Sequence, residues 1–331
     1  MRKRSTIIMI ILAFLVGALL VAQSAQADPY GIYTEAMKKT AQLPDQRVQA
    51  TFEYHMNFAG KPLSPEAVKK VDVFRNIKGT INLTTNHNHD QAYADGRINL
   101  AGTDLQFKAW FKQDQTLMLL PMFTKYMVIT EETKNNKADN FRSLGEKFQS
   151  IWEAELGPTR VTRAQEKLIS TPDGDMRVTE YHITQKDVEV RKCIQETLRI
   201  IFSDPQIRQK IVAIWLQKAD QPGMTPKEAE AQIDVILDKA IGHIDSTQIN
   251  HFTRNVAIDK DLYILQADAD YSGTAKDSQG VIVNTDFSIK LQRYGIGKPV
   301  TIEWPETNSE NSFPPEQMDQ NLPQLLGDFL K

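Results

Sequence analysis

The chain has 331 residues, a formal net charge of −3 and a single cysteine. A mildly acidic chain with scattered basic residues is a poor match for a phosphate backbone, so no nucleic-acid partner is expected. Cys193 has no second cysteine with which to form an intramolecular disulfide, so a hydrophobic core has to stabilise the fold.

The N-terminus has the layout of a cleavable secretory signal. Three basic residues open the chain at positions 2–4, an apolar run follows over residues 7–22, and Ala25 and Ala27 are small residues of the kind a signal peptidase reads. We expect a signal peptide over residues 1–27 and a soluble extracytoplasmic protein, in the periplasm, the cell envelope or secreted. The alternative is an uncleaved anchor, although the apolar run is shorter than the roughly 20 residues that a spanning helix needs.

The first half of the chain reads mainly as strands. A short helix is predicted over residues 30–42, followed by a strand over 48–58 in which apolar and polar residues alternate. Further extended segments are predicted near 71–85, 91–101 and 105–112. The stretch "TLMLLPMFTKYMVIT" at 116–130 hardly alternates, so both of its faces need cover, and Pro121 marks a break or an edge within it.

The second half mixes helices with strands. Helical stripes are predicted over 141–152 and 190–201, from Asp204, and from Thr225, where a capping box opens a helix that Gly242 is placed to close. Strands are predicted over 160–170, 176–185, 247–258, 261–272, 281–293 and 299–304. About ten strands joined by tight turns, with the helices in two blocks, predict an α+β fold with a large antiparallel sheet.

No enzyme signature is present in the sequence. We find no nucleophile elbow, zinc-protease, dinucleotide-binding or phosphate-loop motif, and no pair of carboxylates that would flank a cleft. Cys193 falls on a helical stripe, which favours a buried hydrophobe over a nucleophile. We therefore predict a protein that is not an enzyme and has no cofactor.

One polar cluster raises the possibility of a metal site. In "NHNHD", residues 86–90, His87 and His89 could share one side of an extended chain with Asp90 next to them. The same letters are also typical of a polar hairpin turn between two strands. We favour the turn and predict no metal site.

The methionine and aromatic residues on the strands either pack a core or, where they are in surplus, line a site for an apolar ligand. Methionine adapts to irregular neighbours, and a wide sheet lined by such residues suits an acyl chain. From strand parity alone, ten residues are predicted to bind the ligand: Phe52, Tyr54, Met56, Phe107, Phe111, Leu119, Met122, Tyr126, Phe287 and Ile289. Lys125 and Tyr126 fall where a head group would meet the strand end.

The signal peptide, the short helix and the meander containing "LMLLPMFTKYM" together resemble the outer-membrane-lipoprotein carrier superfamily. The ending "VTIEWPETN" resembles the lipid-binding branch of that superfamily, which includes mycobacterial-type secreted lipoproteins. The resemblance implies a large curved antiparallel sheet, an open half-barrel wrapped over helices, that carries a lipid or an acylated protein. The half-barrel domain would span 28–304 with a helical insert at 187–242, before a flexible tail at 305–331 with a short amphipathic end.

Two departures from that superfamily keep an alternative open. The chain lacks the lipidation cysteine common in the lipid-binding branch, and its helical block is longer than the lid of a minimal carrier. The alternative is a non-enzymatic envelope sensor or protein-interaction module on the same scaffold, with an envelope protein as partner. The ligand and the oligomeric state stay open.

Overall fold

A computed structural model describes residues 28–60, 68, 72, 74–86, 89–112, 115–121, 123–130, 147, 150–205, 208, 211–212, 225–276 and 280–317. The predicted signal peptide, Met122, and most of the helical patterns predicted over 141–152 and from Asp204 lie outside this part. None of the helices that the structure describes is both long and apolar enough to cross a membrane.

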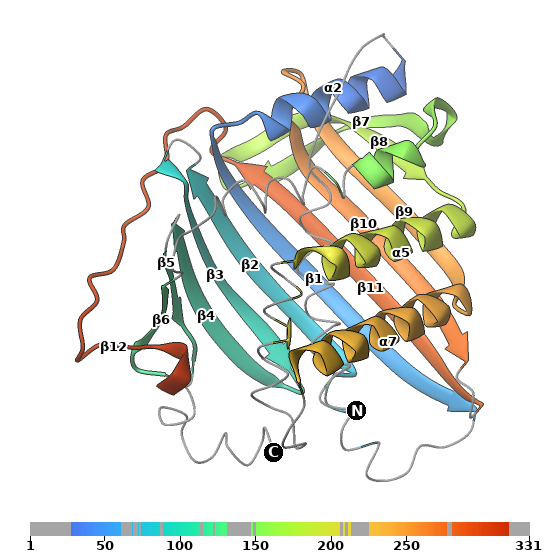
Figure 1. Ribbon diagram of the computed structural model, residues 1–331. Helices are drawn as coiled ribbons and strands as arrows, with labels where there is room; N and C mark the ends of the chain where they lie inside the picture. Colours follow the sequence, from blue (N-terminus) through green and yellow to red (C-terminus); the bar gives the residue numbers. More distant parts are fainter. Residues whose placement is uncertain are drawn as a thin grey trace.

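Twelve strands form one sheet: β1 (Asp45–Gly60), β2 (Asn76–Asn86), β3 (Gln91–Leu100), β4 (Thr103–Lys112), β5 (Gln115–Leu119), β6 (Tyr126–Thr130), β7 (Val161–Thr171), β8 (Gly174–Thr184), β9 (Gln248–Asp259), β10 (Ile264–Lys276), β11 (Val281–Tyr294) and β12 (Ser312–Phe313). Their order is β12-β6-β5-β4-β3-β2-β1-β11-β10-β9-β8-β7, and all neighbours are antiparallel except β12 and β6. Because β7 and β12 end the sheet without pairing to each other, the predicted α+β open half-barrel is confirmed (Figure 1).

Strand alternation gives the sheet one apolar and one polar side. In β1, Val48, Ala50, Phe52 and Tyr54 are buried, whereas Glu53 and the other residues of opposite parity are more exposed. The apolar side carries the helices (Figure 1), and we call it the helix-facing side. Because β1 pairs with β11 and β2 without a register shift, the parity of β1 assigns a side to every residue paired with it.

Helix α2 (Pro29–Ala41) covers one end of the helix-facing side. Asp28 caps its N-terminus by accepting a hydrogen bond from the backbone N–H of Gly31. Tyr33 and Met37 pack into the main core between this helix and the central strands. Near the other end of the helix, the Thr40 hydroxyl accepts a hydrogen bond from the Ile264 N–H at 2.9 Å, which fixes α2 to β10.

Helices α5 (Asp187–Ser203) and α7 (Pro226–Asp245) form a second core over β9. Their apolar stripes enclose Trp152 and pack on Ile249 and Phe252 of that strand. The capping box at the start of α7 is confirmed. The prediction that Gly242 ends this helix is wrong: the helix continues to Asp245, and the Ser246 N–H closes it by donating to the Gly242 carbonyl.

The two-strand unit β7–β8 curls toward the end of β11 on the polar side. In the turn between β7 and β8, the Asp173 carboxylate accepts hydrogen bonds from the Lys298 ammonium and the Gly295 N–H, which hold the pKa of Asp173 below its usual value. Gln292 also donates to the Ser170 carbonyl at 2.5 Å. A small apolar cluster fills this curl: Ile169, Val178, Ala257 and Leu265, with Met176, Tyr263 and Ile296 beside them.

The apolar stretch 116–130 forms the two strands β5 and β6, which are joined through Pro121. Different residues cover the two sides of this strand pair. On the helix-facing side, Met118 and Met127 pack with Phe123 and Phe313. On the opposite side Leu117 is fully buried and pairs with Trp110. The Trp110 ring lies 5.1 Å from that of Tyr93 and 5.8 Å from that of Tyr126, centroid to centroid.

The strand predicted over 299–304 is wrong, because these residues are irregular and the last strand is β12. Hydrogen bonds between its backbone and side chains of neighbouring strands fix this segment, where a strand would use backbone–backbone hydrogen bonds. Asn86 donates to the Val300 carbonyl at 2.8 Å, and the Val300 N–H donates to the Asp45 carboxylate at 3.0 Å. From there the chain runs along the outer edge of the sheet to reach β6 (Figure 1).

Candidate functional site

The helix-facing side of β2–β4 is an apolar surface that is only partly covered. The main contacts of the described helices with the sheet lie on other strands: α2 packs on β7 and β10, and α5 on β9. Seven large apolar side chains on these three strands are half-buried or exposed, and we call them the apolar surface: Ile81, Leu83, Ile98, Leu100, Leu105, Phe107 and Phe111. Phe111 is the most open of them, at 40 % exposure.

Glycines allow the aromatic rings of this side to lie against the sheet. A Cβ placed on Gly96 would come within 2.8 Å of the Phe107 ring, and one on Gly79 within 2.8 Å of the Phe52 ring. Each ring therefore covers the glycine that is its cross-strand partner. The helix-facing side is therefore flat at the centre of β2 and β3, where Gly79 and Gly96 have no side chain.

No ionisable side chain occupies a helix-facing position of β2, β3 or β4. The positions assigned by register hold only aliphatic residues, threonine, glycine and phenylalanine. The positions between them carry the charges, among them Lys78, Arg97, Asp104 and Lys108. On these three strands, a ligand on the apolar surface would therefore contact hydrocarbon and no charge. The only hydroxyl groups at helix-facing positions of the three strands belong to Thr85 and Thr103, near the strand ends.

The register brings seven of the ten predicted site residues onto the helix-facing side. Phe52, Tyr54 and Ile289 are buried in the main core. The other four are half-buried or exposed: Met56, Phe107, Phe111 and Phe287. Phe52 and Ile289 are direct cross-strand partners, as are Tyr54 and Phe287, so the group is continuous across β1 and β11.

The remaining predicted site residues do not join that group. Leu119 pairs with Lys108 and so lies on the opposite side, where Tyr126 stacks edge-on against Trp110. The structure therefore places these two side chains on the side opposite the other seven, because the register of β5 and β6 gives the helix-facing positions to Met118 and Met127. Met122 lies outside the described residues.

Sequence reasoning missed the contribution of β3. Ile98 and Leu100 belong to the apolar surface, but small residues fill the rest of the helix-facing positions of that strand: Ala92, Ala94 and Gly96. Small residues weaken the alternation that marks an apolar strand face. The cross-strand pairing with β2 and β4 is what identifies these positions.

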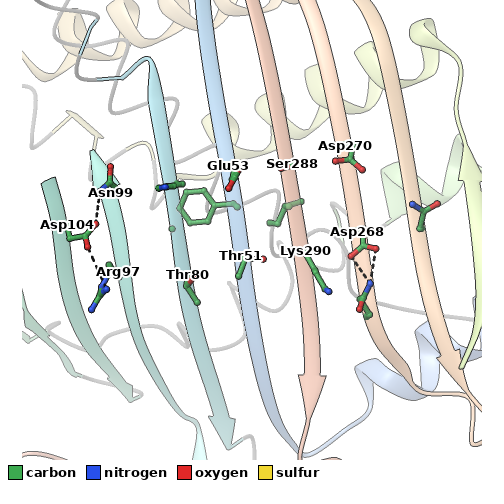
Figure 2. A pocket seen from close by; sticks show the side chains of 16 residues that line it. Thr51, Glu53, Thr80, Arg97, Asn99, Asp104, Asp268, Asp270, Ser288 and Lys290 are labelled. Carbon is green, nitrogen blue, oxygen red and sulfur yellow. Dashed lines mark hydrogen bonds and ion pairs between the residues drawn. The ribbon is translucent and has the colours of Figure 1, made fainter. Parts of the chain in front are cut away.

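The polar side carries an open hollow of about 660 Å³ over the same central strands. Figure 2 shows its lining, in which Arg97, Asn99 and Asp104 lie together at one end and Lys290 and Asp268 at the other. Asn99 donates to the Asp104 carboxylate at 2.6 Å, and the Arg97 guanidinium lies 3.6 Å from the same group.

Asp268 is the most enclosed charge in this hollow. Burial raises the pKa of its carboxyl group, against the hydrogen bonds from the Gln266 amide at 2.9 and 3.1 Å and the attraction of Lys290. Lys290 and Asp268 are direct cross-strand partners, as are Lys78 and Glu53. Opposite charges thus face each other across the strands, as expected of a solvated sheet face.

The described residues contain no group of three or more potential metal ligands. His87 lies outside the described residues, and the backbone N–H of His89 donates to Asn86 in the turn. Burial raises the pKa of Cys193 to about 12, so its thiol stays protonated near neutral pH.

Comparison with known proteins gives little beyond this. No family model matches the chain, and no curated protein matches it. Among solved structures, the chain is similar to a β-barrel-like protein of the domain of unknown function DUF1849 from Brucella abortus, with 9 % identity and a TM-score of 0.20. The match covers 76 % of this chain and 99 % of the other.

Proposed function

We propose that the protein binds an acyl chain of a lipid or an acylated protein on the apolar surface, and that it acts as an extracytoplasmic carrier without catalysing a reaction. One observation carries this proposal: half-buried apolar side chains cover three neighbouring strands with no ionisable group among their helix-facing positions. Apolar side chains that are left partly open together on one surface are typical of a binding site.

The composition of the surface favours an acyl chain over a protein partner. Protein interfaces combine an apolar centre with hydrogen bonds at about one per 100–200 Å². The apolar surface offers almost no side-chain hydrogen-bonding group, and its aromatic rings lie over Gly79 and Gly96. An acyl chain needs neither hydrogen bonds nor one fixed shape. The resemblance to the lipoprotein carrier superfamily agrees with this choice.

The test is the binding of a fluorescent fatty acid to protein that has been freed of lipid by solvent extraction. Phe111→Asp places a charge on the most open part of the apolar surface, and we expect it to weaken binding at least tenfold because the carboxylate would lose water on contact with the chain. Gln106→Asp is the matched control: it adds the same charge to the same strand on the opposite side, and we expect its affinity to stay within twofold of wild type.

Two results would contradict the proposal. The first is a wild-type protein that takes up no fatty acid, which would make the surface a place for protein contacts or internal packing. The second is an equal effect of the two substitutions, which would show that binding does not depend on the helix-facing side of β4. Circular dichroism of each variant verifies that the sheet has formed.

A further inference from the structure

Two buried hydrogen-bond donors without acceptors lie beside the helix-facing side of β9. Arg254 is 4 % exposed and Trp152 is 7 % exposed. The Nε of Arg254 and the indole Nε1 of Trp152 have no hydrogen-bond partner in the part of the chain that the structure describes. Both groups can only donate, and leaving a buried donor unpaired is costly, so the pair calls for an acceptor.

The two donors belong to one cluster. The guanidinium of Arg254 lies 5.6 Å from the centre of the Trp152 ring, and its Nη2 donates to the Tyr33 hydroxyl at 3.2 Å. Tyr33 from α2 and Trp152 from the segment before β7 therefore both contact the guanidinium. The Nε edge of the guanidinium and the indole N–H remain to bind something else.

The carboxyl group of Glu153, which interacts with Arg254, is only partly ionised at neutral pH. Burial raises the pKa of Glu153 to about 7, against the attraction of Arg254. Tyr33, which accepts a hydrogen bond from Arg254, has a pKa raised by burial and is neutral. A buried cation of this kind attracts an anion more strongly than one in water does.

An apolar row connects this cluster to the apolar surface. In register across the helix-facing side, Arg254 is followed by Ala269, Ile289, Phe52, Gly79, Ile98 and Leu105. Ala269, the strand neighbour of Arg254, is only partly buried, as are Tyr271 and Phe287 nearby. Ile289 and Phe52 in this row are buried in the main core, so the open positions beside the row are Ala269, Tyr271, Phe287 and Met56. No charged residue lies in the row between Arg254 and the apolar surface.

We infer that the ligand is an anionic amphiphile, whose acyl chain extends from the partly open positions beside Arg254 toward the apolar surface and whose negatively charged head group accepts hydrogen bonds from Arg254 Nε and Trp152 Nε1. This inference rests on the proposed function and names its ligand class. Arginine is well suited to such a group because its planar fork matches the oxygens of a carboxylate or a phosphate.

The second buried arginine on this side provides the matched control. Arg293 is fully enclosed, donates to the Ile264 carbonyl at 3.3 Å, and also has unpaired donors, at Nε and Nη2. Its cross-strand partner Val48 and the nearby Leu291 are buried as well, so no partly open position adjoins it. It should not contribute to ligand binding.

The experiment compares octadecenoate with octadecenol at pH 7.5, by displacement of the fluorescent fatty acid; a chain of this length spans the four strand steps from β9 to β2, about 19 Å. We expect the wild type to bind the acid at least tenfold more tightly than the alcohol, as one charged hydrogen-bonded pair implies. Arg254→Gln should reduce that ratio to about one with little change in octadecenol affinity. Trp152→Phe keeps the ring and removes only the N–H, and we expect it to lower the ratio several-fold. Arg293→Gln should leave the ratio unchanged.

The outcomes separate this inference from the proposed function. If neither probe binds, the proposed function fails. If acid and alcohol bind equally well, the acyl site stands and the head-group inference is overturned, with water satisfying the two donors. A high ratio that survives both Arg254→Gln and Trp152→Phe would also overturn it, because the anion would then bind elsewhere. Where Arg254→Gln does not fold, Trp152→Phe decides.

Discussion

Single glycines set how closely the aromatic rings approach the sheet. Gly96 and Gly79 lie under Phe107 and Phe52, and a Cβ on Gly96 would meet the Thr80 carbonyl oxygen as well as the ring. A flexible side chain can move away from a new methyl group, but the backbone of a central strand cannot. These two glycines are therefore tied to the shape of the apolar surface.

We predict that Gly96→Ala lowers the free energy of unfolding by about 1–3 kcal/mol, the usual cost of overpacking. The measurement is chemical denaturation. Gly157→Ala is the control: Gly157 has a φ of −79° and no atom within 4 Å of the place where a new Cβ would lie, so its change should stay within about 0.5 kcal/mol. Equal stability of Gly96→Ala and wild type would show that β3 shifts to accept the methyl group.

At the scale of elements, the edge of the sheet depends on a very short strand. Strand β12 has two residues and pairs with Tyr126 and Met127 of β6. Phe313 is buried there against Phe123, with ring centroids 5.1 Å apart. The cluster around Phe313 covers the helix-facing side of the apolar stretch 116–130, and the ladder of two residues contributes far less.

We predict that Phe313→Ala destabilises the protein by about 3 kcal/mol, as expected for truncation of a buried phenylalanine. It should also speed hydrogen exchange of the Tyr126 amide, which donates to the Asn311 carbonyl at 2.9 Å. The exposed Glu310→Ala in the same segment is the control and should change neither quantity. Unchanged exchange in Phe313→Ala would show that β6 holds its position without the C-terminal segment.

At the scale of the whole molecule, buried charge makes stability depend on pH. Glu153 lies between the two cores, near Arg254, and burial raises its pKa from 4.5 to about 7. Between these two values the folded protein keeps a proton that the unfolded chain has lost. Stability from this group is therefore present below pH 4.5, falls as the pH rises toward 7, and changes no further above that.

We predict that wild type loses about 1–2 kcal/mol more than Glu153→Gln between pH 5 and pH 7.5, after allowance for the partial exposure of the carboxyl group. Denaturation at both pH values, with the same denaturant and salt, provides the comparison. Parallel pH profiles for the two proteins would mean that the folded state does not hold the proton.

The sequence was sufficient for the class of fold and for most of its elements. Clean alternation placed β1, β4 and β11, and a capping box placed the start of α7, because these signals depend only on neighbours in the chain. Reasoning from neighbouring residues gave the wrong end for α7 at Gly242, a strand at 299–304 that the structure lacks, and the wrong side of the sheet for Leu119. In each case a contact with another part of the chain decided the conformation or the side.

What the sequence by itself determined is that the sheet has an apolar side and a polar side, since a period of two residues fixes both. Only the tertiary structure decided which strands share the apolar surface, through the register of β2, β3 and β4. It alone also brought Arg254 of β9 beside Trp152, residues about a hundred positions apart in the chain. Hydrogen bonds between strands and packing of helical segments on the sheet set such proximities, and no local pattern of residues encodes them.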